Sequence, residues 1–212
     1  MPNTNAPFGF RPSRHVTGTG HRLNKHKIPS GLAETFTIGD LMKSDGTGGI
    51  KKAAAGDAIL GTFAGWQYDT QGLSSSSYAG SSNGQIPFFK TWVSGQTVPV
   101  GVTVVAWVHD DPFETFEVQT TSTVAEIDIG ALIDLVDGTP NQIFGASRQS
   151  VGAPGGGASQ FRIEKIVQKQ VRIADANNNA TGWGLSGPGQ YAILEVKCAK
   201  HERGGAAMAV AV

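Results

Sequence analysis

The stretch that decides the fold is GQYAILEVKCAKH, residues 189–201. Its side chains form two alternating sets, and successive residues of a strand point to opposite faces of a sheet. The stretch therefore predicts a strand that is buried on one face, with Tyr191, Ile193, Glu195 and Lys197 on one side and Ala192, Leu194, Val196 and Cys198 on the other.

Other stretches of the chain have the same character. ETFEVQTT (114–121) alternates apolar and polar residues, and the run at 102–108 is rich in β-branched residues, as a buried strand is. The 29 glycines and 10 prolines provide frequent turns. The sequence therefore predicts an all-β body, a sandwich or a jelly-roll-like barrel with little helix. Further strands are predicted within residues 34–45, 59–68, 86–93 and 160–175.

One segment predicts a helix instead. In IDIGALIDLVDG (127–138), the residues Ile129, Leu132, Ile133 and Val136 follow helical spacing, and Gly138 is a suitable stop. We expect one short helix or helical turn there. The Ser/Gly-rich segment at 72–85 predicts a mobile loop.

The length and composition of the chain limit the class of protein to which it can belong. The chain has 212 residues, which is enough to bury a core, and its formal net charge is zero. Its one cysteine, Cys198, is expected in the core and agrees with a reducing compartment. The longest apolar run, at 98–108, is too short for a membrane-spanning helix, and the N-terminus lacks an apolar signal core. We expect no membrane association.

Residues 1–33 differ from the rest and are predicted to be an extended basic arm on a body formed by residues 34–212. The first 30 residues hold five Lys or Arg, three histidines and no carboxylate, so an arm of about +5 precedes a body of about −5. Prolines at 7 and 12 restrict the arm, Phe8 and Phe10 are apolar, and Arg11 and Arg14 are forked donors. Such a segment is typical of one that becomes ordered on a partner, and we expect the two phenylalanines to be buried against another chain.

Candidate sites for chemistry are few. His15, His21 and His26 have no carboxylate near them in the sequence, so a zinc site there is not expected. His109, Asp110 and Asp111 follow a predicted strand and could bind Ca²⁺ or Mg²⁺, but a turn is the favoured interpretation. Signatures of a catalytic nucleophile or a phosphate-binding loop are absent. We expect no enzyme activity, no cofactor and no metal.

An ordered set of motifs resembles one known family. NAPFGFRPSRH (5–15) is similar to the start of the capsid cement, or head decoration, proteins of tailed bacteriophages. Further similar stretches follow in the family's order along most of the chain, although the serine-rich loop and the last residues depart from it. These stretches are LGTFAGWQY (60–68), KTWVSGQT (90–97), DDP with FEVQ (110–119), QFRI through Val167 (160–167) and the last strand (193–201).

The resemblance implies a structural virion protein made in the bacterial host cytoplasm. Such proteins bind the outer surface of the phage head and bridge neighbouring subunits of the major capsid protein, commonly as small homo-oligomers; a trimer is favoured here over a dimer. The expected capsid contacts are Pro7, Phe8, Phe10, Arg11, Pro12, Arg14 and His15. Deletion of residues 1–15 is then expected to leave a folded body that no longer binds capsids.

Two alternatives remain open at this point. The chain could be a virion-associated carbohydrate-binding or enzymatic module that uses His109, Asp110 and Asp111. It could also be an internal capsid protein whose basic arm faces DNA, although five positive charges make nucleic-acid binding weak.

Overall fold

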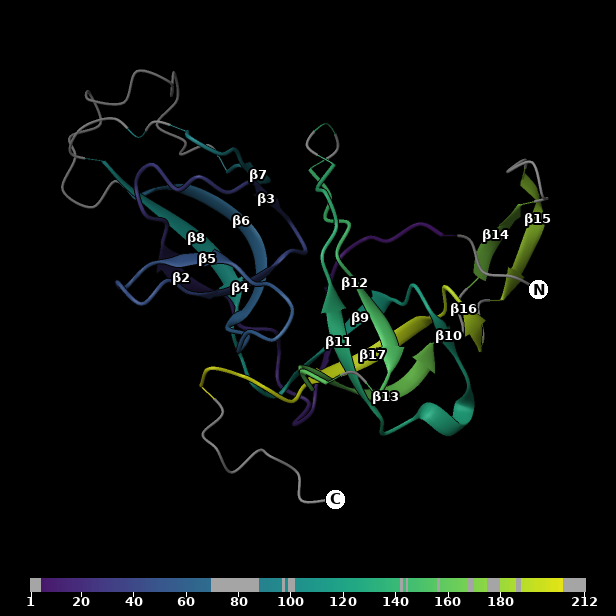
Figure 1. Ribbon diagram of the computed structural model, residues 1–212. Coiled ribbons are helices and arrows are strands. Elements are labelled where there is room, and N and C mark those ends of the chain that lie inside the picture. Colours follow the sequence, from purple (N-terminus) through teal and green to yellow (C-terminus); the bar gives the residue numbers. More distant parts are fainter. Residues whose placement is uncertain are drawn as a thin grey trace.

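The fold is all-β, in agreement with the alternating patterns of the sequence. The computed structural model describes residues 5–69, 88–96, 98, 102–141, 143, 145–155, 157–167 and 188–203, and the backbone alone of 170–174 and 180–185. Within these residues the single helical element is a 3₁₀ turn, η2, at Glu126–Asp128. Antiparallel sheets pack as a sandwich, and Figure 1 shows the two largest side by side.

The stretch quoted first forms a strand at the centre of the larger sheet. β17 (Ile193–Cys198) lies between β9 (Glu114–Gln119) and β13 (Phe161–Val167), with Val196 opposite Phe116 and Ile163. All three side chains are buried, because this face of the sheet packs into the core. The sheet has six antiparallel strands in the order β1 (Arg11–His15), β9, β17, β13, β11 (Leu132–Val136) and β12 (Ser150–Pro154).

The second large sheet has five strands. Its order is β2 (Asn24–Lys27), β8 (Thr103–His109), β6 (Gly61–Asp69), β4 (Leu41–Ser44) and β5 (Ile50–Lys52). Three two-stranded ribbons complete the described strands: β3 (Phe36–Thr37) with β7 (Thr91–Trp92), β10 (Thr123–Val124) with β16 (Gly189–Gln190), and β14 (Gln170–Ala174) with β15 (Ala180–Leu185).

Two clusters of buried side chains hold the sheets together. The first lies on the six-stranded sheet and includes Phe116, Phe161 and Leu194, together with Leu41 of β4 from the other sheet. The second is aromatic and belongs to the five-stranded sheet with the β3–β7 ribbon, where Trp66 meets Trp92 edge-on at 5.3 Å between ring centroids. Burial of such large side chains is the main stabilising contribution to a sandwich.

The helix or helical turn predicted at 127–138 is present only as the η2 turn at its start. Residues 132–136 form β11, in which Ile133 and Leu135 are buried while Leu132 and Asp134 are half-buried and Val136 is exposed. Four apolar residues at helical spacing coincide here with a strand, and pairing with β12 and β13 decides the outcome. Helical geometry is limited to the η2 turn.

The remaining predicted strands have mixed outcomes. β6, β8 and β9 confirm the predictions for 59–68, 102–108 and 114–121. Residues 34–45 hold two short strands, β3 and β4, instead of one, and 160–175 is divided between β13 and β14. The loop predicted at 72–85 lies outside the described residues.

The N-terminal segment is extended, as predicted, but it lies on its own body. β1 is an edge strand of the six-stranded sheet, where Arg11 lies opposite Glu117. β2 is an edge strand of the five-stranded sheet, where His26 lies opposite Ala106. The first 27 residues therefore contribute to both large sheets.

Candidate functional site

Phe10 is part of the core, so the expectation that it is buried against another chain is wrong. Its side chain is 0% exposed. Its ring stacks on Phe161 at a centroid distance of 5.0 Å and meets Phe116 edge-on at 6.5 Å. Deletion of residues 1–15 would remove this ring and the whole of β1, so the truncated body is no longer expected to fold intact.

Phe8, two residues earlier, remains at the surface with the arm's first arginine. Phe8 is half-buried, Arg11 is exposed, and the guanidinium carbon of Arg11 lies 4.4 Å from the centre of the Phe8 ring. A cation over an aromatic face is an attractive contact. Pro7 and Pro12 are half-buried on either side of this pair.

A cleft of about 300 Å³ opens beside this pair. The residues that line it include Phe8, Arg11, Pro12, Lys90 and His109. Apolar surface and two cationic side chains thus meet in one concave region, which suits a peptide segment carrying an acidic residue.

Arg14 contacts its own body instead of being free for a partner. It forms an ion pair with Glu195, whose side chain is 1% exposed and which also contacts Lys165 at 2.8 Å and the Thr115 hydroxyl at 3.2 Å. Burial raises the pKa of Glu195, but the pairing with Lys165 and Arg14 outweighs burial and holds that pKa below its usual range. The carboxylate is therefore charged and satisfied inside the protein.

The three histidines of the N-terminal segment meet the acidic turn that follows β8. His15 Nε2 lies 3.2 Å from Asp111, His26 Nε2 lies 2.7 Å from Asp110, and His21 Nδ1 pairs with Glu114. These histidines have no carboxylate near them in the sequence, but the fold brings them to carboxylates 84 to 96 residues away in the chain.

Asp110 is held by several donors and is not available as a metal ligand. It is buried, and it accepts hydrogen bonds from His26 and from the Asn24 amide, while Arg203 lies 2.9 Å away. Burial raises the pKa of Asp110, but the hydrogen bonds from His26 and Asn24 and the charge of Arg203 together bring it below its ordinary value.

Asp111 forms a turn, which was the favoured interpretation of the sequence. Its Oδ1 accepts the backbone N–H of Phe113 at 2.9 Å, and its own carbonyl accepts the backbone N–H of Glu114 at 3.1 Å. Burial opposes ionisation, yet the Phe113 N–H and His15 lower the pKa of Asp111. His109, Asp110 and Asp111 do not converge on one point, so the sequence-based alternative of a metal site built from these three has no geometric support.

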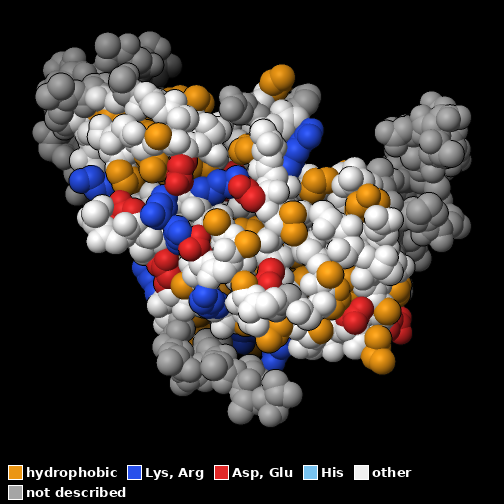
Figure 2. All heavy atoms as spheres, viewed as in Figure 1, with side chains coloured by type: hydrophobic (Ala, Val, Ile, Leu, Met, Phe, Trp, Pro, Cys, Tyr) orange, Lys and Arg blue, Asp and Glu red, His pale blue; other side chains and the backbone are white. Residues whose placement is uncertain are grey.

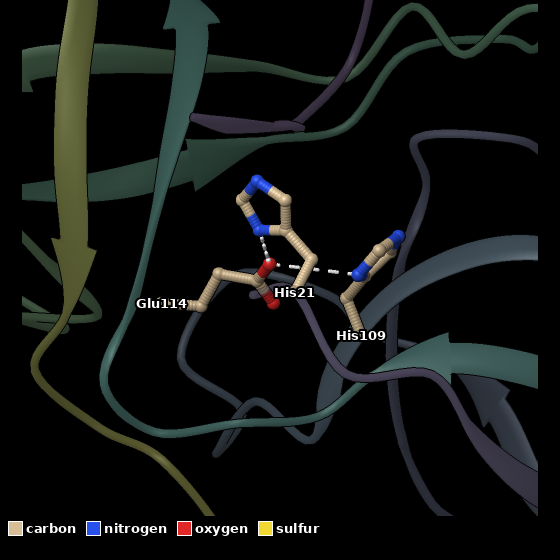
Figure 3. Close-up of side chains that lie close together, drawn as sticks. All are labelled: His21, His109 and Glu114. Carbon is tan, nitrogen blue, oxygen red and sulfur yellow. Dashed lines mark hydrogen bonds and ion pairs between the residues drawn. The ribbon is translucent and has the colours of Figure 1, made fainter. Parts of the chain in front are cut away.

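His109 instead lies with His21 and Glu114 (Figure 3). The ligand atoms of these three side chains all lie within 4.8 Å of one another. His109 comes from the end of β8, Glu114 from the start of β9, and His21 from the segment between β1 and β2. Sequence reasoning missed this group because no spacing in the sequence places His21 beside His109 and Glu114, whose side chain is fully buried.

Cys198 is a core residue, as predicted. It is buried in the first cluster, and burial raises the pKa of its thiol to about 12. A protonated, enclosed thiol is unreactive. Among the described residues, no helix is long and apolar enough to cross a bilayer.

Comparison of the chain with protein-family models, with curated proteins and with solved structures finds no match.

Proposed function

We propose that the chain is a capsid cement protein, which binds the outside of a bacteriophage head and bridges neighbouring major capsid subunits. The ordered resemblance of motifs along most of the chain supports this proposal. The observation that carries it is the surface pair of Phe8 and Arg11 beside the cleft, because this pair belongs to the N-terminal motif. The arm contacts are thereby reduced to Pro7, Phe8, Arg11 and Pro12, since Phe10, Arg14 and His15 are engaged within the chain.

Exposed apolar residues on turns offer further contacts. Ile127 in the η2 turn and Ile143 between β11 and β12 are 91% and 90% exposed. Single exposed apolar residues are common on protein surfaces, so they add to the proposal without carrying it. A lattice partner that covered them would gain apolar burial at two separate points.

Binding only to the assembled lattice would stabilise the shell by mass action, as any ligand of the native state does. We propose a homo-oligomer, with a trimer favoured, because several arms on one particle then dock at a high effective concentration. Weak individual contacts of the size of the Phe8–Arg11 pair can give firm attachment in this way.

The direct experiment is a cryo-electron reconstruction of phage particles that carry this chain. We expect density for it on the outer lattice, with residues 7–12 against a capsid subunit. Absence from the shell would contradict the proposal, and a position against the packaged DNA would favour the internal alternative instead.

A binding assay tests the proposed contact itself. Heads assembled without this chain are mixed with purified protein, and co-sedimentation is measured. We expect Phe8→Ala and Arg11→Glu each to weaken binding at least about tenfold, the usual effect of losing a buried contact. Arg22→Glu makes the same charge change at an exposed residue that is not among those lining the cleft, and it should bind like the wild type. Equal binding by all variants would exclude the Phe8–Arg11 pair as the contact.

A further inference from the structure

The group formed by His21, His109 and Glu114 has buried polar atoms that lack partners. The Glu114 side chain is 0% exposed, and its Oε1 is paired with His21 Nδ1 and lies 3.5 Å from His109 Nδ1. Glu114 Oε2 and His109 Nδ1 are enclosed and have no hydrogen-bond partner among the described residues. Figure 3 shows both imidazole Nδ1 atoms directed at the carboxylate.

Such an arrangement is costly as it stands. A buried polar atom without a partner loses its hydration and gains nothing in return, and the cost is larger for a carboxylate. The carboxylate is enclosed, and the two histidines beside it are 40% exposed (His21) and 16% exposed (His109). A cation between the three side chains would satisfy Glu114 and both Nδ1 atoms together.

We infer that His21, His109 and Glu114 bind one Zn²⁺ ion, with water as the fourth ligand. Zinc takes imidazole nitrogen at about 2.0–2.1 Å and carboxylate oxygen at about 2.0–2.2 Å in a tetrahedron, so its ligand atoms lie about 3.3 Å apart. The three ligand atoms here already lie within 4.8 Å of one another. His21 is on an exposed segment, so it can adjust its position to complete the geometry.

The ligand types select the metal. Ca²⁺ and Mg²⁺ prefer sites made entirely of oxygen atoms, whereas two imidazoles and one carboxylate suit zinc. The same set also occurs around ferrous iron. A tetrahedral site completed by one water is the zinc arrangement, and a site that takes Fe²⁺ but not zinc would contradict the inference.

One inferred ligand, His109, lines the same cleft as Phe8 and Arg11, but the role of the ion goes beyond the proposed function. It would join the exposed segment between β1 and β2 to the β8–β9 turn. His21 and Glu114 are 93 residues apart in the chain. A metal that closes so long a loop restricts the unfolded chain and stabilises the folded one.

The experiment uses the full chain without a histidine tag, purified without chelator. Metal content is measured by mass spectrometry, and ZnCl₂ is titrated into chelator-treated protein by calorimetry. We expect one Zn²⁺ per chain. At a free Zn²⁺ concentration 100 times the Kd, the Tm should rise by about 5–10 °C. Co²⁺ in the site should give the intense visible absorption of a tetrahedral complex.

The variants separate the site from general histidine binding. His21→Ala removes an exposed ligand and should fold, yet it should lose zinc binding and the Tm rise. His109→Ala should do the same, and Glu114→Gln should weaken binding by at least about tenfold. His26→Ala removes a histidine that contacts Asp110 instead, and it should bind zinc like the wild type.

Three results would overturn the inference. The first is the absence of zinc binding tighter than about 100 μM, which would leave the group as a buried histidine–carboxylate pair. The second is unchanged binding in His21→Ala. The third is a stoichiometric site for Fe²⁺ that zinc does not occupy. None of these results bears on capsid binding, so failure here is distinguishable from failure of the proposed function.

Discussion

At the scale of single residues, two phenylalanines separated by one glycine have different environments. Phe10 is fully enclosed by Phe116 and Phe161, whereas Phe8 is half-buried beneath Arg11. Gly9 makes this division possible, because its φ of +77° turns the chain between them in a conformation that glycine adopts readily. Core stability and the proposed capsid contact thus fall to different residues of one short motif.

Phe10→Ala should therefore destabilise the protein strongly. Loss of a buried aromatic ring leaves a cavity and typically costs about 3–5 kcal/mol of unfolding free energy. Urea unfolding followed by circular dichroism measures the change. Phe8→Ala is the matched control and should cost about 1 kcal/mol, because that ring is only half-buried. Equal losses for the two variants would contradict the placement of Phe10 in the core.

Glu195 should contribute to stability in a pH-dependent manner. Its pKa is lowered in the folded protein, so its contribution is fully present above the ordinary value of 4.5 and is lost as the pH falls through the folded pKa. Glu195→Gln should cost about 1–3 kcal/mol near pH 7, since Arg14 and Lys165 lose their charged partner. The variant should also lose less stability than the wild type between pH 5 and pH 3.

The measurement is the unfolding free energy in urea at several pH values across that range. Glu126→Gln is a suitable control, because Glu126 is exposed in the η2 turn. Its pH profile should match that of the wild type. A Glu195→Gln profile parallel to the wild type would show that the ion pairs do not lower the pKa of Glu195.

At the scale of elements, the edge strands at the N-terminus depend on close backbone contacts. A Cβ atom on Gly9 would lie 2.4 Å from Ser147 Cβ and 2.8 Å from the Gly39 carbonyl oxygen. Gly18 has nearly the same φ, +76°, but has nothing within 4 Å of a Cβ atom. An alanine at either position would therefore suffer the same backbone strain. The two positions differ only in the room that they leave for a Cβ atom.

Gly9→Ala should consequently be more damaging than Gly18→Ala. Both variants suffer the strain of a positive φ, which costs about 1 kcal/mol. Gly9→Ala must also displace β1 or the segment around Ser147, which adds about 1–3 kcal/mol. Thermal unfolding of the two variants gives the difference directly. A Tm loss as large for Gly18→Ala would contradict the close packing around Gly9.

The strands that the sequence predicted well are those with a clear local pattern. The sequences of β17 and β9 alternate, although both strands are largely buried on both faces and not on one as predicted, and β8 has a long β-branched run. β1 and β2 lack such a pattern, because they are short edge strands whose pairing with β9 and β8 is decided by residues about 80 to 100 positions away. The apolar residues of β11 have helical spacing, and the segment forms a strand because it pairs with β12 and β13.

The candidate sites likewise could be predicted only where they depend on residues that are close together in the sequence. The turn formed by Asp111 is local and was predicted. The group of His21, His109 and Glu114 was not, because no spacing in the sequence places His21 beside the other two. The burial of Phe10 was likewise hidden, since a phenylalanine in a Pro/Gly-rich segment gives no sign of which chain encloses it.

At the scale of the whole molecule, the surface is mixed rather than dominated by one charge. Figure 2 shows acidic and basic side chains interspersed on one face, with hydrophobic side chains scattered among them. The net charge of zero agrees with this picture. Long-range attraction to a charged lattice is then weak, and attachment would depend on local contacts and on several arms acting together.

The proposed trimer makes a simple prediction. Light scattering coupled to size exclusion should give a mass of three times the 22.1 kDa of one chain. Dilution should lower this mass only if the association is weak. A mass of one chain at all concentrations would contradict the trimer and would remove the avidity argument.

The central place of β17 has a consequence for how the protein is made. Ribosomes add roughly 5–20 residues per second from the N-terminus, so β1, β9 and β13 are synthesised before residues 193–198. Until then β9 and β13 have no strand between them, and the six-stranded sheet cannot form. Folding of this half is therefore a late event in biosynthesis, and the unpaired edges of β9 and β13 are the surfaces that a chaperone would need to shield.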